Sequence, residues 1–199
     1  MAVQRGLWRT AVEQAMLALD HGPTYLPLHL RITDIQLKEN KQTEALEKLA
    51  LIARTYRVRG DTLQAGKTYE RILQINPMDV NSRTELINLL VQQGDLRSAL
   101  SFYLDLADVY TQLADMEGGR QTYESALMLA VRNNADKSWQ VQLLYRLGDL
   151  RWGEDRRHEK IRLGREGLEL LEDDGDLVRA SVVIIPVEDL LFASDAYRQ

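Results

Sequence analysis

The sequence predicts an all-helical protein, and three observations lead to that prediction. Apolar residues recur at steps of three and four along most of the chain, which is the period of a helix buried along one face. Short polar breaks, several of them glycine–aspartate pairs, interrupt this pattern and supply helix ends and helix caps. The run 182–185, rich in Val and Ile, is the main candidate for a strand, and Pro186 cuts it short.

The stretch 45–77 shows how each element is predicted. Its apolar period stops at Gly60 and Asp61 and resumes over 63–75. Glycine adopts the left-handed conformation that ends a helix, and aspartate accepts from the free N–H groups that begin the next one. Pro77 ends the second helix because the residue before proline avoids helical angles. The stretch is therefore predicted to be two antiparallel helices joined by a tight turn.

The same signals predict further helices on either side of this hairpin, about eight in total with a C-terminal cap. Gly94-Asp95 repeats the turn chemistry, and Gly148-Asp149 is a third such pair, although 150–152 can continue the helix. The expected helices besides the hairpin cover 8–18, 25–37, 79–91, 96–113, a stretch through 123–130, a stretch through 139–147, and 156–171.

Composition fits a folded domain without a membrane span. The chain has 199 residues, of which 45% are hydrophobic and 28% charged, so a sizeable core is expected. It has no cysteine, which leaves neither disulfides nor thiolate metal sites and fits a reducing, cytoplasmic location. No stretch approaches the roughly 18 uncharged apolar residues of a membrane span, so membrane insertion is not expected.

Charge placement argues against nucleic acid as a partner. The formal net charge is −5, and residues 1–153 contain 18 acidic and 18 basic side chains. Residues 154–199 contain 12 acidic and 7 basic side chains and supply the whole excess. Such a chain offers no broad basic face for phosphate backbones.

The spacing of the turns carries a family resemblance. Gly94-Asp95 follows Gly60-Asp61 at a sequence offset of 34, which is the length of the tetratricopeptide repeat, a helix–turn–helix unit that stacks into a superhelix. The sequence resembles that family, although Ile72 replaces its second alanine and Arg83 stands at the tryptophan position of the following unit. The positions of unit 46–79 that match the family motif are Leu49, Ile52, Ala53, Tyr56, Ala65, Tyr69 and Pro77.

The resemblance implies a right-handed superhelical solenoid of antiparallel helix hairpins over residues 1–175. Residues 176–199 are expected to form a capping helix or an assembly segment, since the end of a solenoid needs a cover.

A second period, with a sequence offset of 54, lies over the first. It aligns 45–46 with 99–100, 68–70 with 122–124, and Pro23 with Pro77. The stretch 96–113 therefore matches both a second helix and a first helix of neighbouring hairpins. We infer a three-helix super-repeat, in which inner and outer roles can exchange along the array and make its curvature irregular.

No motif indicates catalysis, a cofactor or a bound metal. Gly60 and Gly66-Lys67-Thr68 resemble a phosphate-binding loop, but five residues instead of four separate the glycines, and no strand precedes them. The three histidines are isolated, and the acidic run 172–176 lacks the ligand spacing of a calcium loop. The chain is therefore expected not to be an enzyme.

The resemblance instead implies a groove for a protein or peptide, lined by the first helix of each hairpin. Some family members clamp a C-terminal carboxylate with lysine and asparagine, but only Asn88 matches here, with Thr84 where lysine is needed. The alternative is that these positions are simply solvated polar faces. The positions predicted to contact a partner are Glu47, Arg54, Arg57, Asn81, Thr84, Asn88, Gln92, Asp108 and Gln112.

Two functions remain open from the sequence. The first is a protein-interaction scaffold whose groove binds a partner. The second is a structural subunit that assembles into a homo-oligomer or larger complex, or a regulatory arm of a multidomain protein, with the apolar segment 177–192 as a candidate assembly surface.

Overall fold

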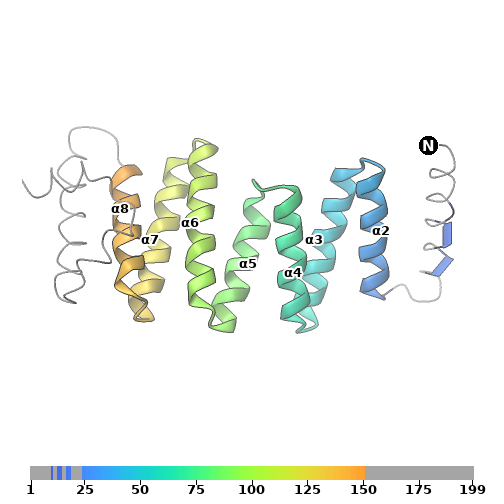
Figure 1. The fold of residues 1–199 in the computed structure, drawn as a ribbon, viewed down its shortest axis with the longest axis horizontal. Coiled ribbons are helices and arrows are strands. Elements are labelled where there is room, and N and C mark those ends of the chain that lie inside the picture. Colours follow the sequence, from blue (N-terminus) through green and yellow to red (C-terminus); the bar gives the residue numbers. More distant parts are fainter. Residues whose placement is uncertain (1–9, 11–12, 15–16, 19–23, 151–199) are drawn as a thin grey trace, which may run out of the picture. The chain divides into compact units, whose positions relative to one another are not determined.

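The expected all-helical class is confirmed for the part of the chain that the structure describes. The computed structural model describes residues 24–150 and five isolated positions before them: 10, 13, 14, 17 and 18. Over that part it contains seven helices and no strand (Figure 1). They are α2 (Leu26–Lys38), α3 (Gln42–Val58), α4 (Thr62–Ile75), α5 (Val80–Gln93), α6 (Leu96–Gln112), α7 (Met116–Arg132) and α8 (Lys137–Leu150).

Some of the predicted elements lie beyond this part of the chain. The helix expected at 8–18 lies mostly outside the described residues, and the helix at 156–171 and the segment 176–199 lie wholly outside them. The count of about eight helices, the handedness of the superhelix and the division at residue 175 therefore stay predictions.

The chain divides into two compact units. Unit 1 covers Met1–Leu89 and unit 2 covers Leu90–Gln199, so the boundary falls inside α5. The described part of unit 1 holds α2, α3, α4 and most of α5, and that of unit 2 holds the last turn of α5 followed by α6, α7 and α8.

The predicted turn chemistry sets the helix starts. The carboxylates of Asp61, Asp95 and Asp115 each accept a hydrogen bond from the backbone N–H of the residue three positions later. The N···O distances are 3.1, 3.1 and 2.8 Å. The residue before each aspartate has a positive φ, 80° at Gly60, 78° at Gly94 and 61° at Ala114. The left-handed residue ends one helix and the aspartate begins the next, so these turns are short.

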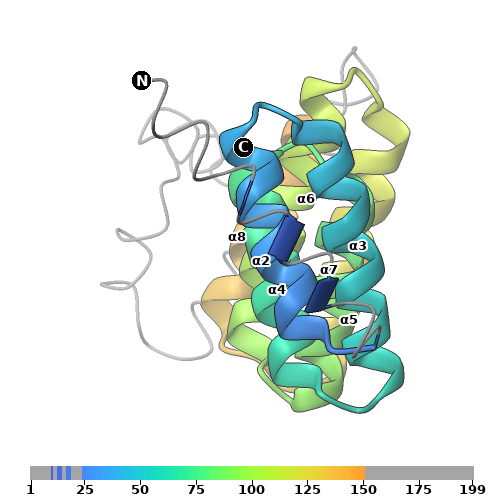
Figure 2. The same ribbon diagram turned by 90° about the vertical axis from the view of Figure 1, so that its right-hand side faces the viewer.

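In unit 1, the helices alternate between two sides. Figure 2 shows α2 and α4 on one side and α3 and α5 on the other. An ion pair links Asp34 of α2 with Arg71 of α4, and another links Arg57 of α3 with Glu85 of α5. The core between the two sides contains Ala45, Leu49 and Ala53 of α3, which are completely buried, together with the buried hydroxyl-bearing residue Thr33 of α2.

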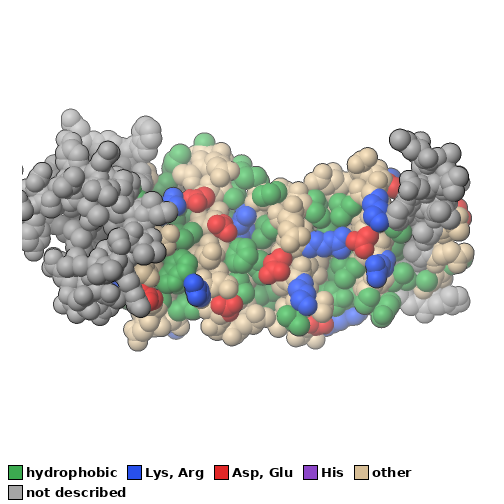
Figure 3. Space-filling view, in the orientation of Figure 1, with side chains coloured by type: hydrophobic (Ala, Val, Ile, Leu, Met, Phe, Trp, Pro, Cys, Tyr) green, Lys and Arg blue, Asp and Glu red, His purple; other side chains and the backbone are tan. Residues whose placement is uncertain are grey.

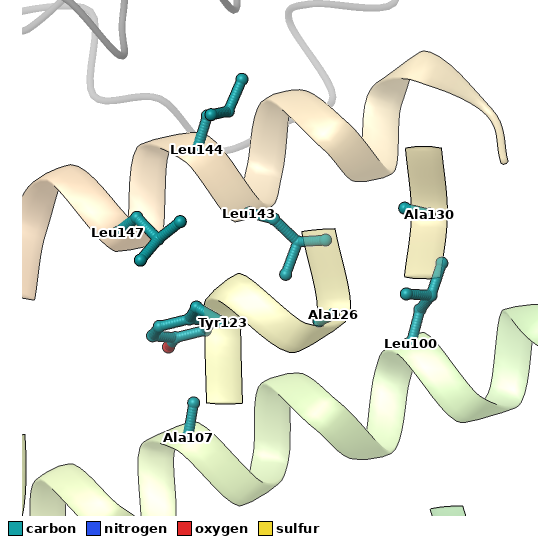
Figure 4. Packing of buried hydrophobic residues seen from close by; sticks show 8 residues of the cluster. All are labelled: Leu100, Ala107, Tyr123, Ala126, Ala130, Leu143, Leu144 and Leu147. Carbon is teal, nitrogen blue, oxygen red and sulfur yellow. The ribbon is translucent and has the colours of Figure 1, made fainter. Parts of the chain in front are cut away.

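In unit 2, the core is built by α6, α7 and α8. Small residues allow close approach, since Ala107, Ala126 and Ala130 have no exposed surface. Leucines and one tyrosine fill the remaining space, as Figure 4 shows. The core cluster consists of Leu100, Ala107, Tyr123, Ala126, Ala130, Leu143, Leu144 and Leu147.

The helix starts follow the longer of the two sequence periods. The helices α2, α3 and α4 begin at residues 26, 42 and 62, and α5, α6 and α7 begin at 80, 96 and 116. Each start in the second set follows its counterpart at the same sequence offset of 54. The three-helix super-repeat is therefore present in the placement of the helices, whereas the exchange of inner and outer roles stays a prediction.

Two positions singled out in the sequence have particular surroundings in the structure. Gly148 and Asp149 do not form a turn but lie within α8, which continues to Leu150, and Gly148 is buried. Arg83, at the position of the family's tryptophan, is 7% exposed, and its Nη1 donates to the carbonyl oxygen of Pro77 at 2.7 Å. Arg83 thus bonds to the loop that follows α4 through Nη1, whereas its buried Nε has no hydrogen-bond partner among the described residues.

Candidate functional site

The structure places the nine predicted contact residues on three helices. Glu47, Arg54 and Arg57 lie on α3; Asn81, Thr84, Asn88 and Gln92 lie on α5; Asp108 and Gln112 lie on α6. Eight of the nine are exposed, and Asp108 is half-buried. Their exposure is compatible with a binding surface, and whether they contact a partner stays a prediction.

An ion pair brings the α3 and α5 residues of unit 1 together. The Nη1 atom of Arg57 donates to Oε2 of Glu85, 28 residues further along the chain. Glu85 is next to Thr84 and one helical turn before Asn88, so all three lie on or beside one stretch of α5. We call the surface formed by Glu47, Leu51, Arg54, Arg57, Val58, Asn81, Thr84, Glu85 and Asn88 the α3–α5 face.

The α3 part of this face carries exposed apolar side chains as well as charges. Leu51 is 66% exposed and Val58 is 84% exposed. With Glu47 and Arg54 they form one stripe along the helix, at steps of four, three and four residues. The stripe therefore exposes apolar area as well as charged groups.

Behind the α3–α5 face lies a buried tyrosine without a hydrogen-bond partner. Tyr69 of α4 is 1% exposed, and its hydroxyl makes no hydrogen bond to any described residue. Burial raises the pKa of the Tyr69 phenol, the carboxylate of Glu85 raises this pKa further, and the guanidinium groups of Arg57 and Arg54 oppose the increase. The hydroxyl therefore stays protonated at neutral pH and lies within electrostatic range of the three charged groups of the face.

The corresponding tyrosine in unit 2 has its partner. Tyr123, which the longer sequence period aligns with Tyr69, donates to Oδ1 of Asp108 at 2.9 Å. The Nη1 atom of Arg146, on α8, lies 3.8 Å from the same carboxylate oxygen. Asp108 is thus held between a phenol and a guanidinium, which makes it a structural residue of unit 2 as well as a predicted contact residue.

The predicted contact residues omit Leu51 and Glu85 of the face. Tyr69, which lies behind the face, enters the sequence analysis as a match to the family motif, not as a contact residue. The alignment between the two copies nevertheless holds a signal, because Tyr69 matches Tyr123, whereas Arg54 matches Asp108. The sequence alone therefore shows that both copies have the tyrosine, whereas the hydrogen-bond acceptor Asp108 of the second copy corresponds to a donor, Arg54, in the first.

The rest of the described chain offers no comparable site. No group of three or more histidine, aspartate or glutamate residues suitable for a metal occurs in it. None of the helices described is both long and apolar enough to cross a bilayer. A hollow of about 620 Å³ lies along α2, but the described residues that line it all come from that one helix: Arg31, Asp34, Ile35, Leu37 and Lys38.

Charges of both signs are interspersed on the surface of unit 1. Figure 3 shows acidic and basic side chains alternating over α2 and α4 on the face turned to the viewer. The ion pair of Asp34 with Arg71 belongs to that side of the unit. Gly66, Lys67 and Thr68 lie inside α4, so they form no phosphate-binding loop.

Comparisons with known proteins find matches only among solved structures. No model of a known family matches the chain, and no curated protein matches it. Among solved structures, 88 chains match. Neighbouring described helices pack as hairpins, as the resemblance stated from the sequence implies.

Three of the similar structures illustrate the range. BtubC from P. vanneervenii is 15% identical, with a TM-score of 0.40, 100% of this chain covered and 93% of that one. The C-terminal part of a TPR repeat-containing protein from Cytophaga hutchinsonii is 14% identical, with a TM-score of 0.38 and coverages of 79% and 68%. The APC/C hetero-tetramer Cut9–Hcn1 is 17% identical, with a TM-score of 0.33, 98% of this chain covered and 46% of that one. Similarities this low assign no function or partner to the chain.

Proposed function

We propose that this chain is a non-enzymatic protein-interaction scaffold that binds a segment of a partner protein on the α3–α5 face. The ion pair between Arg57 and Glu85 is the observation that carries the proposal. It joins exposed residues of two helices into one surface that exists before any partner arrives. A preformed surface costs less ordering on binding than a flexible one.

The composition of the face suits a polypeptide. Leu51 and Val58 offer apolar area that a partner would remove from water, at about 25 cal/mol for each Å². The amides of Asn81 and Asn88 and the hydroxyl of Thr84 are exposed and can bond to the backbone of an extended segment. Apolar anchors surrounded by polar groups are the usual arrangement of a protein–protein contact.

The proposal is tested by changing α5, where the exposed side chains are not needed for the core. Lysine at both Thr84 and Asn88 places two long cations on the face, and the matched control exchanges Lys67 and Glu70, exposed on α4, for Glu and Lys. Partners captured from native lysate are identified by mass spectrometry and rebuilt with purified components. A direct partner should lose at least about tenfold in affinity with the α5 variant, equal to about 1.4 kcal/mol, and keep its affinity for the control. Equal affinity for both variants in every reconstituted complex contradicts the proposal.

A second candidate is self-assembly through the tips of the hairpins. Leu63 is 62% exposed beside the α3–α4 turn, and Leu113 and Met116 are 54% and 48% exposed at the α6–α7 turn. Exposed apolar side chains beside both turns favour docking through the tips of the hairpins. Light scattering during size-exclusion chromatography measures the mass directly. A 22.8 kDa monomer at all concentrations argues against assembly. A larger species that dissociates to the monomer in the Leu63→Asp variant supports it.

A further inference from the structure

We propose that the α3–α5 face recognises the side-chain carboxylate of an acidic residue in the partner segment, and that the Tyr69 hydroxyl and the Arg54 guanidinium hold it. This inference rests on the proposed function and specifies the chemistry of the partner. Its starting point is the difference between two copies of one structural unit within the chain.

The second copy shows what occupies this place. The helix pair α6–α7 begins at the same sequence offset of 54 from α3–α4, and Tyr69 and Tyr123 are equivalent positions in them. Tyr123 donates to the carboxylate of Asp108, at 2.9 Å, and Arg146 approaches that carboxylate at 3.8 Å. A phenol and a guanidinium thus bind one carboxylate, which the chain itself supplies.

In the first copy, the carboxylate is missing at the equivalent position. Arg54 stands where Asp108 stands in the second copy. A guanidinium has donors and no acceptor, so Arg54 cannot accept the proton of the phenol in the way Asp108 does. The Tyr69 hydroxyl accordingly has no hydrogen-bond partner among the described residues, although the residue is 1% exposed. Buried polar groups are nearly always paired in proteins, so an unpaired one calls for an explanation.

Charge leads to the same conclusion. The face holds two arginines, Arg54 and Arg57, and Glu85 is paired with Arg57. The other acidic residue of the face, Glu47, lies seven residues, about two helical turns, before Arg54 on α3. Arg54 forms no ion pair with any residue that the structure describes, so its guanidinium has no carboxylate partner near the unpaired hydroxyl. A single carboxylate would satisfy both groups, because a carboxylate accepts hydrogen bonds and carries one negative charge.

The neighbours of Arg54 make a peptide the source of that carboxylate. Leu51 and Val58 lie on either side of Arg54 along the exposed stripe of α3 and are 66% and 84% exposed. Two turns of helix separate them by about 10 Å, and an extended chain advances about 3.3 Å for each residue. Because side chains of an extended chain alternate between its two faces, an acidic residue with an apolar residue two positions away on each side presents all three to the α3–α5 face. A small free anion would leave both apolar residues uncovered.

The experiment uses the whole chain and short peptides as probes. The probe is acetyl-Leu-Ala-Glu-Ala-Leu-amide, and its matched control replaces Glu with Gln, which removes the charge and keeps the shape. A third peptide has Gln and a free C-terminus. Binding is followed by NMR through the Nε signals of labelled arginines and the ring signals of Tyr69. The Glu peptide is expected to shift Arg54 and Tyr69 in a saturable way, with the Gln peptide bound at least about tenfold more weakly.

A variant separates loss of the site from loss of the fold. Arg54→Asp reproduces the arrangement of the second copy. The new carboxylate should accept a hydrogen bond from the Tyr69 hydroxyl, as Asp108 accepts one from Tyr123. We expect this variant to lose the response to the Glu peptide while its urea midpoint rises. Lys67→Asp, at an exposed position of α4, is the control for a change of charge alone and should keep the response.

The outcomes divide clearly. Equal binding of the Glu and Gln peptides at the α3–α5 face would overturn the carboxylate site and leave the scaffold proposal standing. Preference for the peptide with a free terminus would overturn the assignment to a side chain. Absence of any response at Arg54 and Tyr69, or a response kept by Arg54→Asp, would also overturn it. Failure of the α5 lysine variant to weaken a reconstituted complex is the separate result that refutes the scaffold.

Discussion

Tyr69 and Tyr123 have the same place in two copies of a three-helix unit, but only the Tyr123 hydroxyl has a partner among the described residues. Replacing each with phenylalanine removes one oxygen and should give opposite results. Tyr123→Phe loses a hydrogen bond to a carboxylate, so the free energy of unfolding should fall by about 1–2 kcal/mol. Tyr69→Phe removes an unsatisfied buried group, so it should be neutral or stabilising by up to about 1 kcal/mol. Urea titration followed by circular dichroism measures both.

The same pair of variants tests whether Glu85 serves Tyr69 in solution. If the Glu85 carboxylate moves from Arg57 to the phenol, Tyr69→Phe should destabilise about as much as Tyr123→Phe. Glu85→Gln would then add little to Tyr69→Phe, because the two changes would remove the same bond. That pattern would contradict an unpaired hydroxyl.

Ala114 is a residue in a conformation that suits glycine. Its φ is 61°, whereas the equivalent turn positions Gly60 and Gly94 have φ of 80° and 78°. A left-handed conformation costs an L-residue about 1–2 kcal/mol, and glycine avoids this strain. Glycine in turn loses more conformational entropy on folding than alanine, which costs about 0.5–1 kcal/mol. Ala114→Gly should therefore raise the free energy of unfolding by about 0.5–1 kcal/mol, measured in urea. Gly94→Ala is the reverse control and should lower it; a loss of stability in Ala114→Gly would show that the turn relaxes in solution.

At the scale of the element, the first turn of α7 makes stability depend on acid. The carboxylate of Glu117 accepts two hydrogen bonds, one from Nε of Arg120 at 2.9 Å and one from Nε2 of Gln121 at 2.8 Å. These bonds lower the pKa of Glu117 to about 2 from an ordinary 4.5. A hydrogen bond from Ser98 likewise lowers the pKa of Asp95, at the start of α6.

The sign of the effect follows from these depressed values. The unfolded chain binds protons first as pH falls, so the stabilisation is complete above about pH 5 and is lost progressively toward pH 2. Because Glu117 is exposed, solvent weakens the effect. Thermal unfolding between pH 2 and pH 7 should show a smaller drop in Tm for Glu117→Gln than for the wild-type chain. A parallel drop in both proteins would show that the pair contributes nothing.

Helix placement could be predicted because its determinants are local. Gly60 with Asp61, and Gly94 with Asp95, mark turns in the sequence and form them in the structure, and α6 begins at the predicted residue. At Gly148 the sequence left the end of the helix undecided, because a glycine marks either a helix end or a close packing contact. In the structure Gly148 is buried inside α8.

The site could be predicted only in outline. The exposed positions of α3 and α5 follow from the repeat period, so their exposure was within reach of the sequence. The pairing of Arg57 with Glu85 depends on how two separate helices pack side by side, which no local pattern specifies. The unpaired state of the Tyr69 hydroxyl depends on Arg54, which lies on another helix and stands where the second copy has the acceptor Asp108.

At the scale of the whole molecule, α5 is the one described helix that both compact units share. The boundary between the units falls between Leu89 and Leu90, inside this helix. Repeat proteins gain cooperativity from coupling between neighbouring repeats, so a continuous α5 should make the two units unfold together. Their cooperativity should therefore depend on α5 remaining unbroken.

Leu90→Pro tests this coupling. Proline removes one backbone hydrogen bond and clashes with the preceding turn, at a cost of about 3 kcal/mol, whereas Leu90→Ala loses packing at the same position and keeps the helix. Hydrogen exchange by mass spectrometry across a urea series reports residues 24–89 and 90–150 separately. In the wild-type chain and in Leu90→Ala both segments should open at one midpoint, and in Leu90→Pro they should open at two. Two midpoints already in the wild-type chain would mean that α5 does not couple the units, and a single midpoint in the proline variant would place the coupling outside this helix.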